Sequence, residues 1–302
     1  MPSRMLVEVD GREVELSNLD KVLYPSAGFT KAEVIDYYTR VAPALLPHLR
    51  GRPLTRIRYP NGVAGQGFFE KNAPSGKPGW VRTETLPVPN STHGRETIDF
   101  VVVDDLPTLV WIANIASLEL HTPQWRIGAD PDLLVVDLDP GEPAGLRECA
   151  AVAVLVRDRL GDDGIACYPK TSGKKGMQLC CPVAGTQNSE IISGYAKRVA
   201  EELARTVPGG ITAKMAKQLR PGKIFIDWSQ NAAFKTTVAP YSLRALSLPT
   251  ASAPLSWGEV ESFAIGSATA HQLSPSEVLA RLESDGDLLA ALLSPGPEVP
   301  AR

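Results

Sequence analysis

Apolar positions recur along this chain with two different periods, and the two periods alternate. Short runs rich in Val, Ile and Leu, bounded by turn residues, are typical of strands. Longer stretches with apolar residues three and four positions apart are typical of helices, and two of them open with a Ser/Thr-x-x-Glu capping box. The pattern predicts strands over residues 5–9, 13–16, 54–59, 97–103, 133–139, 164–170, 176–181 and 223–227, and helices over residues 30–47, 107–120, 143–160, 188–206 and 274–293.

This alternation predicts an α/β (α+β) fold, with residues 1–302 forming a single domain. A stretch rich in Pro, Ser and Ala at 247–256 is the expected linker between a core of about 5–246 and a C-terminal helical appendage of about 257–295. The appendage is too short to be an independent domain. The last residues, 296–302, are expected to be disordered.

The composition is ordinary for a globular chain, with 43% hydrophobic and 22% charged residues. No apolar run reaches the ~18 residues that a membrane helix needs, and the first five residues lack the apolar core of a signal peptide. The four cysteines do not have the spacing of metal ligands. We therefore expect no membrane contact and a cytoplasmic location, where thiols stay reduced.

Charge is distributed unevenly, although the net charge is only −3. Residues 50–82 hold seven Lys and Arg against one acid, and residues 205–244 hold seven against Asp227 alone. The segment 256–302 is acidic and cancels them in the sum. Because a phosphate backbone responds to a local basic patch, the two basic segments are compatible with nucleic-acid binding. The alternative is that both are simply solvated faces.

Three carboxylates end two of the predicted strands. Asp137 and Asp139 close the run Leu133–Asp139, and Asp227 closes Lys223–Asp227. Residues i and i+2 of a strand share a face, so Asp137 and Asp139 should project side by side and repel unless a cation lies between them. A third carboxylate would complete an all-oxygen site for Mg²⁺ or Mn²⁺, of the kind used in phosphoryl and nucleotidyl transfer. The alternative is a turn or helix cap, since Asp-Pro-Gly favours turns.

Two further features carry candidate chemistry. The turn Thr171–Gly176 offers backbone N–H groups, a hydroxyl and two lysines, which suits a triphosphate. It lacks the spacing of a P-loop, and such turns are usually plain hairpin loops. His121 follows an apolar stretch, a position more often structural than catalytic. Phe68 and Phe69 lie beside basic residues, where aromatic rings can stack on bases as well as fill a core.

Eight short stretches are more specific as an ordered set than as single motifs. In sequence order they are Asn18–Pro25, Arg58–Val63, Phe68–Lys71, His121–Trp125, Asp137–Gly141, Thr171–Gly173, Asp227–Asn231 and Ala239–Arg244. Together they resemble the polymerase (primase-polymerase) domain of bacterial DNA ligase D, a branch of the archaeo-eukaryotic primase superfamily. The resemblance implies a primase-like catalytic core of antiparallel or mixed sheets flanked by helices.

The resemblance also implies an activity and its cofactors. Members of this family are template-dependent nucleotidyltransferases that fill short gaps at DNA breaks and prefer ribonucleotides. Asp137, Asp139 and Asp227 match the family's metal ligands, which hold two divalent cations, Mn²⁺ preferred or Mg²⁺. His121 matches an active-site histidine. Ser172, Lys175 and Arg244 match triphosphate contacts, and Gln178 and Gln230 lie in the nucleotide-binding motifs.

DNA contacts and partners follow from the same resemblance. Asn18, Lys21 and Lys31 match a pocket for the 5′-phosphate on the far side of a gap. Phe68 and Phe69 match aromatic residues at the template bend, and Arg220 lies in a basic loop that engages a second DNA end. Arg58 and Lys71, in the same motifs, are expected to contact DNA. The implied partners are gapped or broken DNA, NTPs or dNTPs, a Ku-like end-binding protein and a DNA ligase, in a bacterial, nucleoid-associated setting.

One position departs from the family pattern. The motif S-x-x-K-G-x-H normally ends in histidine, and this chain has Gln178 there. Glutamine can donate a hydrogen bond to a sugar or phosphate, but it cannot become cationic or transfer a proton at neutral pH. We therefore expect weaker triphosphate stabilisation, or a shifted preference between ribose and deoxyribose.

Two other functional classes remain open from the residues themselves. One is a DNA-end-binding module with a vestigial metal site, which Gln178 allows and the three intact carboxylates oppose. The other is a haloacid-dehalogenase-like phosphatase, suggested by a hydrophobic strand that ends in Asp-x-Asp. In that class the motif lies near the N-terminus and is followed by Thr or Val, whereas Pro140 follows it here.

Overall fold

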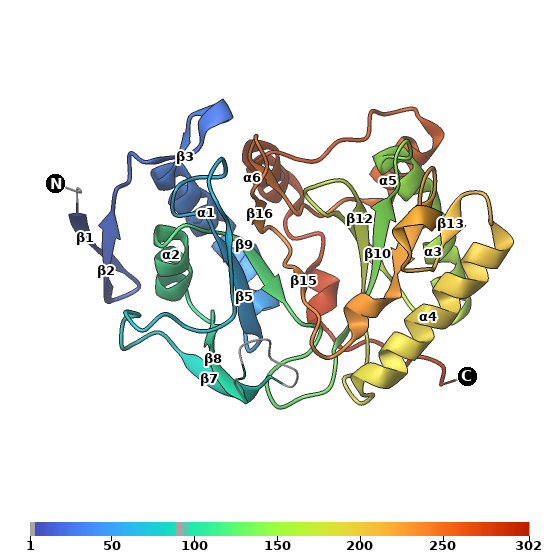
Figure 1. The fold of residues 1–302 in the computed structure, drawn as a ribbon, viewed down its shortest axis with the longest axis horizontal. Helices are drawn as coiled ribbons and strands as arrows, with labels where there is room; N and C mark the ends of the chain where they lie inside the picture. Colours follow the sequence, from blue (N-terminus) through green and yellow to red (C-terminus); the bar gives the residue numbers. More distant parts are fainter. Residues whose placement is uncertain (1–3, 89–93, 95, 302) are drawn as a thin grey trace. The chain divides into compact units, whose positions relative to one another are not determined.

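The computed structural model describes residues 4–88, 94 and 96–301. The chain divides into two compact units that alternate along the sequence. Unit 1 comprises Met1–Thr122, Tyr241–Ala251 and Ser274–Gly286, and unit 2 comprises Pro123–Pro240, Ser252–Leu273 and Asp287–Arg302. Each unit contains sheets and helices, which confirms the predicted mixed α/β class (Figure 1).

Unit 1 is built around an antiparallel sheet in which the strands lie in the order β9-β5-β8-β7, with β6 also paired to β5. The hairpins β1-β2, β3-β4 and β16-β17 add smaller pairs. Its elements are β1 (Arg4–Val9), β2 (Arg12–Ser17), β3 (Val22–Tyr24), η1 (Pro25–Ala27), β4 (Phe29–Thr30), α1 (Lys31–Leu49), β5 (Pro53–Arg58), β6 (Phe68–Glu70), β7 (Thr83–Pro87), β8 (Thr97–Val102), α2 (Leu106–Asn114), β9 (Ser117–Thr122), β16 (Leu243–Arg244), β17 (Thr250–Ala251) and α6 (Pro275–Asp285).

Helix α1 begins at the predicted capping box, in which Thr30 accepts from the Glu33 N–H and Glu33 accepts from the Thr30 N–H. The same helix anchors distant segments of unit 1 through its buried tyrosines. The Tyr37 hydroxyl donates to the Tyr241 carbonyl, and the Tyr38 hydroxyl donates to the Leu118 carbonyl, both at 2.7 Å. A buried hydroxyl needs such a partner. The Tyr38 hydroxyl also accepts from the Leu243 N–H at 3.0 Å, so both tyrosines fix the path of the 241–251 segment.

The prediction of one helix over residues 107–120 is correct for its first half and wrong for its second half, which is a strand. Helix α2 ends at Asn114, Ala116 adopts a positive φ of 58°, and β9 begins at Ser117. The segment is a short helix followed by a short strand, and periodicity alone cannot tell a short apolar strand from the continuation of a buried helix. Because residues 117–122 form a strand, Glu119 and His121 lie on the same face of it.

Unit 2 contains a five-stranded mixed sheet of order β11-β12-β10-β14-β13, in which only the β13–β14 pair is parallel. Helices α3, α4 and α5 lie beside this sheet in Figure 1. Its elements are β10 (Leu133–Pro140), α3 (Leu146–Asp162), β11 (Tyr168–Thr171), β12 (Met177–Pro182), α4 (Ser189–Thr206), β13 (Ile211–Thr212), η2 (Lys217–Leu219), β14 (Ile224–Asp227), η3 (Trp228–Asn231), β15 (Thr237–Val238), α5 (Trp257–Ile265) and η4 (Ala290–Leu293).

The segment 247–256 is not a linker. Ser252 and Ala253 are fully buried, the Thr171 N–H donates to the Ala253 carbonyl at 2.8 Å, and the Leu255 N–H donates to the Pro169 carbonyl at 2.9 Å. The small residues that suggest a flexible connection in the sequence instead let the backbone pack against β11. The expected appendage also does not form one body, because α5 belongs to unit 2 and α6 to unit 1. The terminal helix is shorter than predicted, ending at Asp285.

The C-terminal segment differs from the disorder expected for 296–302. Val299 is buried, its N–H donates to the Gln187 side-chain oxygen, and its carbonyl accepts from the Gln187 amide. The Ala184 N–H donates to the Pro297 carbonyl at 3.1 Å. One apolar anchor and a side chain that satisfies both backbone groups are enough to order this segment, and Arg302 lies outside the described residues.

Within the part of the chain that the structure describes, no helix combines the length and the apolar character that a membrane crossing requires.

Candidate active site

Strands β10 and β14 run antiparallel with Asp137 directly opposite Asp227. Asp139 lies two residues further along β10 and shares a face with Asp137. Carboxylate oxygens of the three residues all lie within 4.8 Å of one another. Asp137 and Asp227 are buried, and Asp139 is half-buried. The structure therefore brings together all three carboxylates that the sequence singled out.

This cluster is electrostatically costly without a cation. Burial, followed by the nearby Asp139 charge, raises the pKa of the Asp137 carboxyl to about 7. Burial and the Asp227 charge also raise the pKa of Asp139. A divalent cation would offset this repulsion, and the donor set of three carboxylates is that of a hard-cation site. The residues present thus fit Mg²⁺ or Mn²⁺.

Asp227 is held in place by the turn that follows it. The Ser229 hydroxyl donates to Asp227 Oδ1 at 2.6 Å, and the Gln230 amide donates to Oδ2 at 2.8 Å. Asn231 then pairs with the backbone of Val135 through both ends of its amide, which ties the turn to β10. Gln230, expected to bind nucleotide, is therefore placed as a partner of a metal-ligand candidate.

Gln178 is the residue directly opposite Asp137 on β12. Its amide nitrogen donates to Asp137 Oδ1 at 3.0 Å, and its amide oxygen accepts from Lys170 Nζ at 2.5 Å. Lys170 lies opposite Gln178 on β11 and is almost fully buried. The position where the family has histidine thus connects a buried ammonium to the acidic cluster.

Two glycines allow loops to approach the strand that carries the carboxylates. A Cβ on Gly141 would lie 2.0 Å from the Arg220 carbonyl oxygen, and one on Gly176 would lie 2.1 Å from the Leu138 oxygen. Both distances are impossible for a side chain, so only glycine fits. Gly176 also ends the turn of Ser172, whose Oγ accepts N–H bonds from Lys174 and Gly176.

Two cations that the sequence singled out, Lys175 and Arg220, lie on loops of unit 2. Lys175 is exposed and pairs with Glu142 at 3.0 Å, a contact that a triphosphate can replace at little cost. Arg220 stacks on Phe225 at 3.7 Å, and its charge partly offsets the rise in the pKa of Asp139 that burial and Asp227 cause. Arg220, expected in a loop for a second DNA end, therefore has its guanidinium near the acidic cluster.

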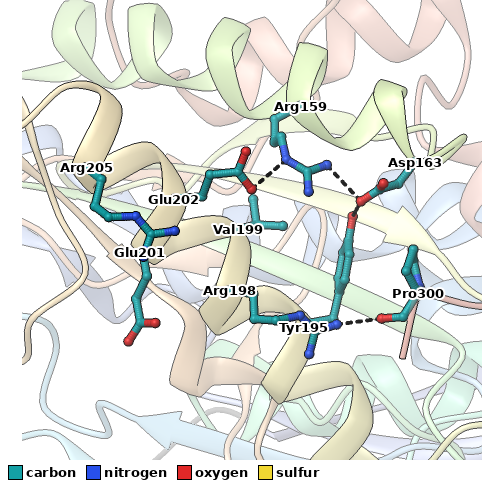
Figure 2. Close-up of a pocket in the computed structure, with 9 residues that line it drawn as sticks. All are labelled: Arg159, Asp163, Tyr195, Arg198, Val199, Glu201, Glu202, Arg205 and Pro300. Atoms are coloured by element: carbon teal, nitrogen blue, oxygen red, sulfur yellow. Dashed lines mark hydrogen bonds and ion pairs between the residues drawn. The ribbon is translucent and has the colours of Figure 1, made fainter. Parts of the chain in front are cut away.

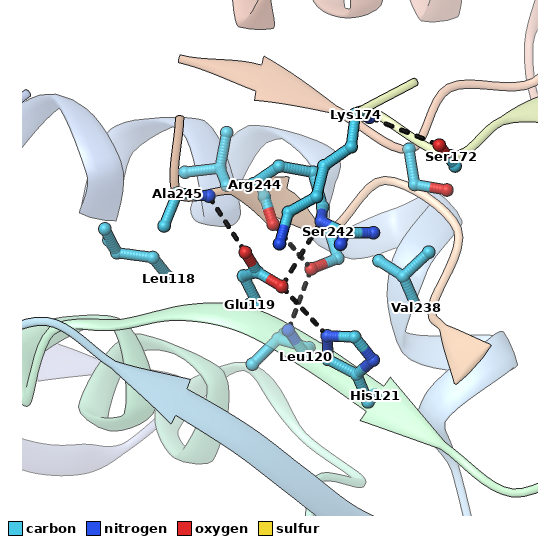
Figure 3. Close-up of polar contacts among 12 residues, drawn as sticks. Leu118, Glu119, Leu120, His121, Ser172, Lys174, Val238, Ser242, Arg244 and Ala245 are labelled. Atoms are coloured by element: carbon cyan, nitrogen blue, oxygen red, sulfur yellow. Dashed lines mark hydrogen bonds and ion pairs between the residues drawn. The ribbon is translucent and has the colours of Figure 1, made fainter. Parts of the chain in front are cut away.

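Unit 1 contains a second cluster of polar side chains, centred on Glu119 (Figure 3). Glu119 is fully buried and accepts from His121 Nε2 at 3.1 Å and from the Ala245 N–H at 3.1 Å. It also forms an ion pair with Arg244 at 3.2 Å. The structure thus brings together His121 and Arg244, which the sequence could only place 123 positions apart. Both are held by a carboxylate that sequence reasoning missed.

The three residues expected to bind a 5′-phosphate lie near one another in unit 1. Asn18 has a positive φ of 51°, and its carbonyl accepts from the Lys21 N–H. Lys31 is buried and donates to the Ser17 carbonyl. Burial, followed by the Lys21 charge, lowers the pKa of Lys31 to about 8. Lys21 Nζ is 3.4 Å from the side-chain oxygen of Asn61.

Strand β6 carries the expected template-contacting residues. Phe68 and Phe69 are 42% and 61% exposed, which is unusual for phenylalanine and leaves both rings available for stacking. Lys71 follows the strand directly. Arg58 is less accessible, since its guanidinium donates to Glu70 and to the Ile115 carbonyl. Part of the basic run at 50–82 therefore serves the fold.

A cavity of about 430 Å³ lies elsewhere in unit 2, between α3, α4 and the C-terminal segment (Figure 2). Its lining includes three arginines and three acids, namely Arg159, Arg198, Arg205, Asp163, Glu201 and Glu202. Arg159 bridges Asp163 and Glu202, and Arg198 donates to the Pro300 carbonyl. Because its three arginines are balanced by three acids, this lining lacks the excess positive charge that a phosphate site requires.

A mixed sheet whose adjacent strands bring three carboxylates within 4.8 Å of one another is compatible with metal-dependent phosphoryl or nucleotidyl transfer. The chain belongs to the LigD primase-polymerase domain family, which it matches over residues 30–289. This confirms the resemblance seen in the sequence, assigns the chain a polymerase role and contradicts the phosphatase alternative.

The individual proteins that the chain resembles belong to the same family. The multifunctional non-homologous end joining DNA repair protein LigD of Mycobacterium tuberculosis is 44% identical over 296 residues, which are 95% of this chain and 38% of that protein. The bifunctional LigD of Bacillus subtilis is 33% identical over 83% of this chain and 40% of its own length. The chain thus spans about two fifths of these relatives. The solved polymerase domain of M. tuberculosis ligase D in complex with DNA superposes with a TM-score of 0.87 at 43% identity, covering 93% of this chain and 98% of that one.

Glu119 and Lys170 are the main site residues that sequence reasoning missed. Glu119 precedes His121 by two positions, a signal visible only once that segment is assigned to a strand. Lys170 lies in a predicted strand, but its link to Asp137 depends on strand order β11-β12-β10, which the sequence does not reveal.

Proposed function

We propose that this chain extends a primer strand across short, templated gaps in broken DNA, with a preference for ribonucleotides, during non-homologous end joining. Its family and the DNA complex of the M. tuberculosis polymerase domain support the reaction and the substrate. The observation that carries the proposal is the cluster of Asp137, Asp139 and Asp227, whose carboxylate oxygens lie within 4.8 Å of one another.

In this proposal the three carboxylates hold two divalent cations, Mn²⁺ in preference to Mg²⁺. Such cations lower the pKa of a primer 3′-hydroxyl and offset the charge of a triphosphate and its leaving pyrophosphate. The protein fixes the ligand geometry beforehand. Asp227 is oriented by Ser229 and Gln230, and Asp137 by Gln178, so little reorganisation is needed when a cation binds.

The remaining residues bind and orient substrates. Ser172, Lys175 and Arg244 contact the triphosphate, and Glu119 supports this role by holding both Arg244 and His121. Asn18, Lys21 and Lys31 bind the 5′-phosphate of the gap. The exposed rings of Phe68 and Phe69 stack at the template bend. A Ku-like end-binding protein and a DNA ligase are the proposed partners, in the nucleoid of a bacterial cytoplasm.

The test is extension of a labelled primer across a short gap with a 5′-phosphate, using Mn²⁺ or Mg²⁺ and either NTPs or dNTPs. The proposal predicts addition of the templated nucleotide, faster with NTPs and with Mn²⁺. Tight, phosphate-dependent gap binding without any addition would contradict it and favour an end-binding module.

A further inference from the structure

Four side chains stand in one row across the unit 2 sheet. The strand registers place Lys170 of β11 opposite Gln178 of β12, Gln178 opposite Asp137 of β10, and Asp137 opposite Asp227 of β14. Directly opposed residues project from the same face of a sheet. The row therefore runs from a buried cation, through a neutral amide, to the acidic cluster.

Lys170 is an unusual residue for the interior of a sheet. It is 1% exposed, and its ammonium donates to Gln178 Oε1 at 2.5 Å, to Ser252 Oγ at 2.6 Å and to the Val238 carbonyl at 3.0 Å. An ammonium has three N–H groups, so all of them have acceptors. Burying a charge costs free energy, which the three hydrogen bonds partly offset. The same hydrogen bonds fix the ammonium in one position, from which it can orient a neighbouring side chain.

The neighbour that Lys170 orients is the Gln178 amide. An amide can point either end toward Asp137, since its oxygen and nitrogen are nearly equal in size. Lys170 can only donate, so it holds the amide oxygen and leaves the NH₂ group to face Asp137. The reversed amide would set an acceptor against Oδ1 of Asp137 and two donors against the ammonium. Lys170 thus decides which end of Gln178 meets the carboxylate.

We propose that Lys170 is a positioning residue of the acidic centre, and that it acts through the Gln178 amide to hold Asp137 in the geometry that a divalent cation requires. This inference rests on the proposed function, because it assumes that the carboxylates bind a cation. The place of Gln178 in the motif suggests that it contacts the nucleotide. The inference gives it a different role, that of a partner of Asp137. Partners of metal ligands commonly change metal affinity or activity about 10- to 100-fold when removed.

The direction in which loss of Lys170 changes cation affinity distinguishes a positioning role from a purely electrostatic one. If Lys170 acted only by its charge, removing it would leave the centre more negative, and a cation would bind more tightly. If it positions Asp137 through Gln178, its removal weakens cation binding, because the amide is free to turn and Asp137 loses its fixed donor. The two effects act in opposite directions on one measurable dissociation constant.

The experiment is an Mn²⁺ titration followed by electron paramagnetic resonance, without nucleotide or DNA, on wild type, Lys170→Met, Gln178→Leu and the double variant. We expect each single variant to raise the Mn²⁺ dissociation constant about 10-fold or more. The double variant should be no worse than the worse single one, since both changes break the same chain of contacts. Steady-state nucleotide addition should show a lower kcat with little change in the KM for NTP.

Controls separate the possible failures. Lys77→Met removes a half-buried lysine of unit 1 that donates to the Val81 carbonyl, and should bind Mn²⁺ as wild type does. Thermal unfolding checks that each variant is folded, and Gln178→Leu tests the inference even if Lys170→Met does not fold. Asp137→Asn tests the centre itself: if wild type and Asp137→Asn bind Mn²⁺ equally, the proposed function fails.

Three results would overturn the inference while leaving the proposed function intact. One is an Mn²⁺ dissociation constant for folded Lys170→Met or Gln178→Leu within twofold of wild type, or tighter. Another is a double variant whose effect is the product of the two single effects. The third is a rise in the KM for NTP with unchanged kcat and Mn²⁺ binding, which would return Gln178 to the role of nucleotide contact.

Discussion

The ionised side chain of Asp137 destabilises the metal-free fold, and it is also a candidate ligand of the cation. Its burial and the neighbouring carboxylates raise its pKa to about 7, far above the value of a free aspartate. The ionised form that a cation needs is therefore the form that the metal-free fold tolerates least. A site that is poorly stabilised when empty gains most when the cation binds.

We expect the metal-free protein to lose stability as the pH rises. The folded pKa lies above the unfolded value, so the stabilisation is present at low pH and is lost as pH rises through about 7. Between pH 5 and pH 8 this corresponds to about 2–3 kcal/mol, or about 5 °C in Tm. Tm measured in the presence of a chelator should fall by that amount in wild type and much less in Asp137→Asn. Asp36→Asn, at an exposed carboxylate, should behave as wild type, and an equal fall in Asp137→Asn would exclude Asp137 as the cause.

A second prediction concerns Glu119, the buried partner of His121 and Arg244. Glu119→Gln leaves the Arg244 guanidinium without its anion, and breaking a buried pair in this way costs about 3 kcal/mol. Urea unfolding should show a loss of that size, together with a higher KM for NTP. The matched change Glu15→Gln removes the partner of an exposed ion pair with Arg4 and should cost less than about 1 kcal/mol. Equal losses in the two variants would contradict the account of Glu119.

Single residues are the part of the site most predictable from the sequence. Asp137, Asp139 and Asp227 end apolar runs, and that signal survives in any arrangement of the strands. The partners of these residues are not predictable in the same way, because Lys170 and Glu119 act through strand order and burial. A lysine or a glutamate carries no mark in the sequence that distinguishes a buried, hydrogen-bonded side chain from a solvated one.

At the scale of elements, loops and strands fit each other closely around the acidic cluster. Gly176 follows the Ser172 turn and lies directly against the carbonyl of Leu138, the residue between Asp137 and Asp139. Any Cβ there must displace β10 or the turn. The position of the two carboxylates therefore depends on a residue that has no side chain.

Gly176→Ala should reduce nucleotide addition by about 10-fold or more, because the added methyl group would lie 2.1 Å from the Leu138 oxygen. Steady-state primer extension measures the loss. Gly161→Ala is the matched control, since no atom lies within 4 Å of the position that its methyl group would take in α3, and it should retain full activity. If Gly176→Ala extended the primer at the wild-type rate, the turn and the strand would be able to separate without loss of activity.

Element boundaries are also where sequence reasoning fails. The apolar run 107–120 predicts one helix, and the structure divides it into α2 and β9 at Ala116. The capping boxes at Thr30 and Ser274 predict the helix starts correctly, because a cap is a local hydrogen-bonding pattern. A helix end set by sheet pairing has no comparable local signal. The Pro- and Ser-rich segment 247–256 is wrongly predicted as a linker because small residues are equally suited to a flexible connection and to close backbone packing, which it makes against β11.

On the scale of the whole molecule, the chain crosses repeatedly between its two units. Unit 1 receives the segments Tyr241–Ala251 and Ser274–Gly286 after unit 2 has begun. A linear division into domains, with a core followed by an appendage, does not anticipate this exchange. The mixed α/β class is predictable because it depends on which elements exist and not on how the chain connects them.

Whole-molecule charge also bears on DNA binding. The net charge is −3, so attraction to DNA must come from local groups such as Lys21 and Lys31. The double variant Lys21→Ala/Lys31→Ala should bind phosphorylated and unphosphorylated gaps equally in a fluorescence anisotropy titration. Lys197→Ala, an exposed position on α4, should keep the wild-type preference for the phosphorylated gap. A wild type that makes no distinction between the two gaps would show that these lysines do not form a phosphate pocket.

The central claim is that three carboxylates make this fold a metal-dependent polymerase. Its most direct test is single-turnover addition of one complementary NTP to a primer on gapped DNA with Mn²⁺, in wild type and Asp139→Ala. We expect templated addition by wild type and a loss of about 100-fold or more in the variant, with gap binding nearly unchanged. Comparable addition rates in the two proteins would contradict the claim.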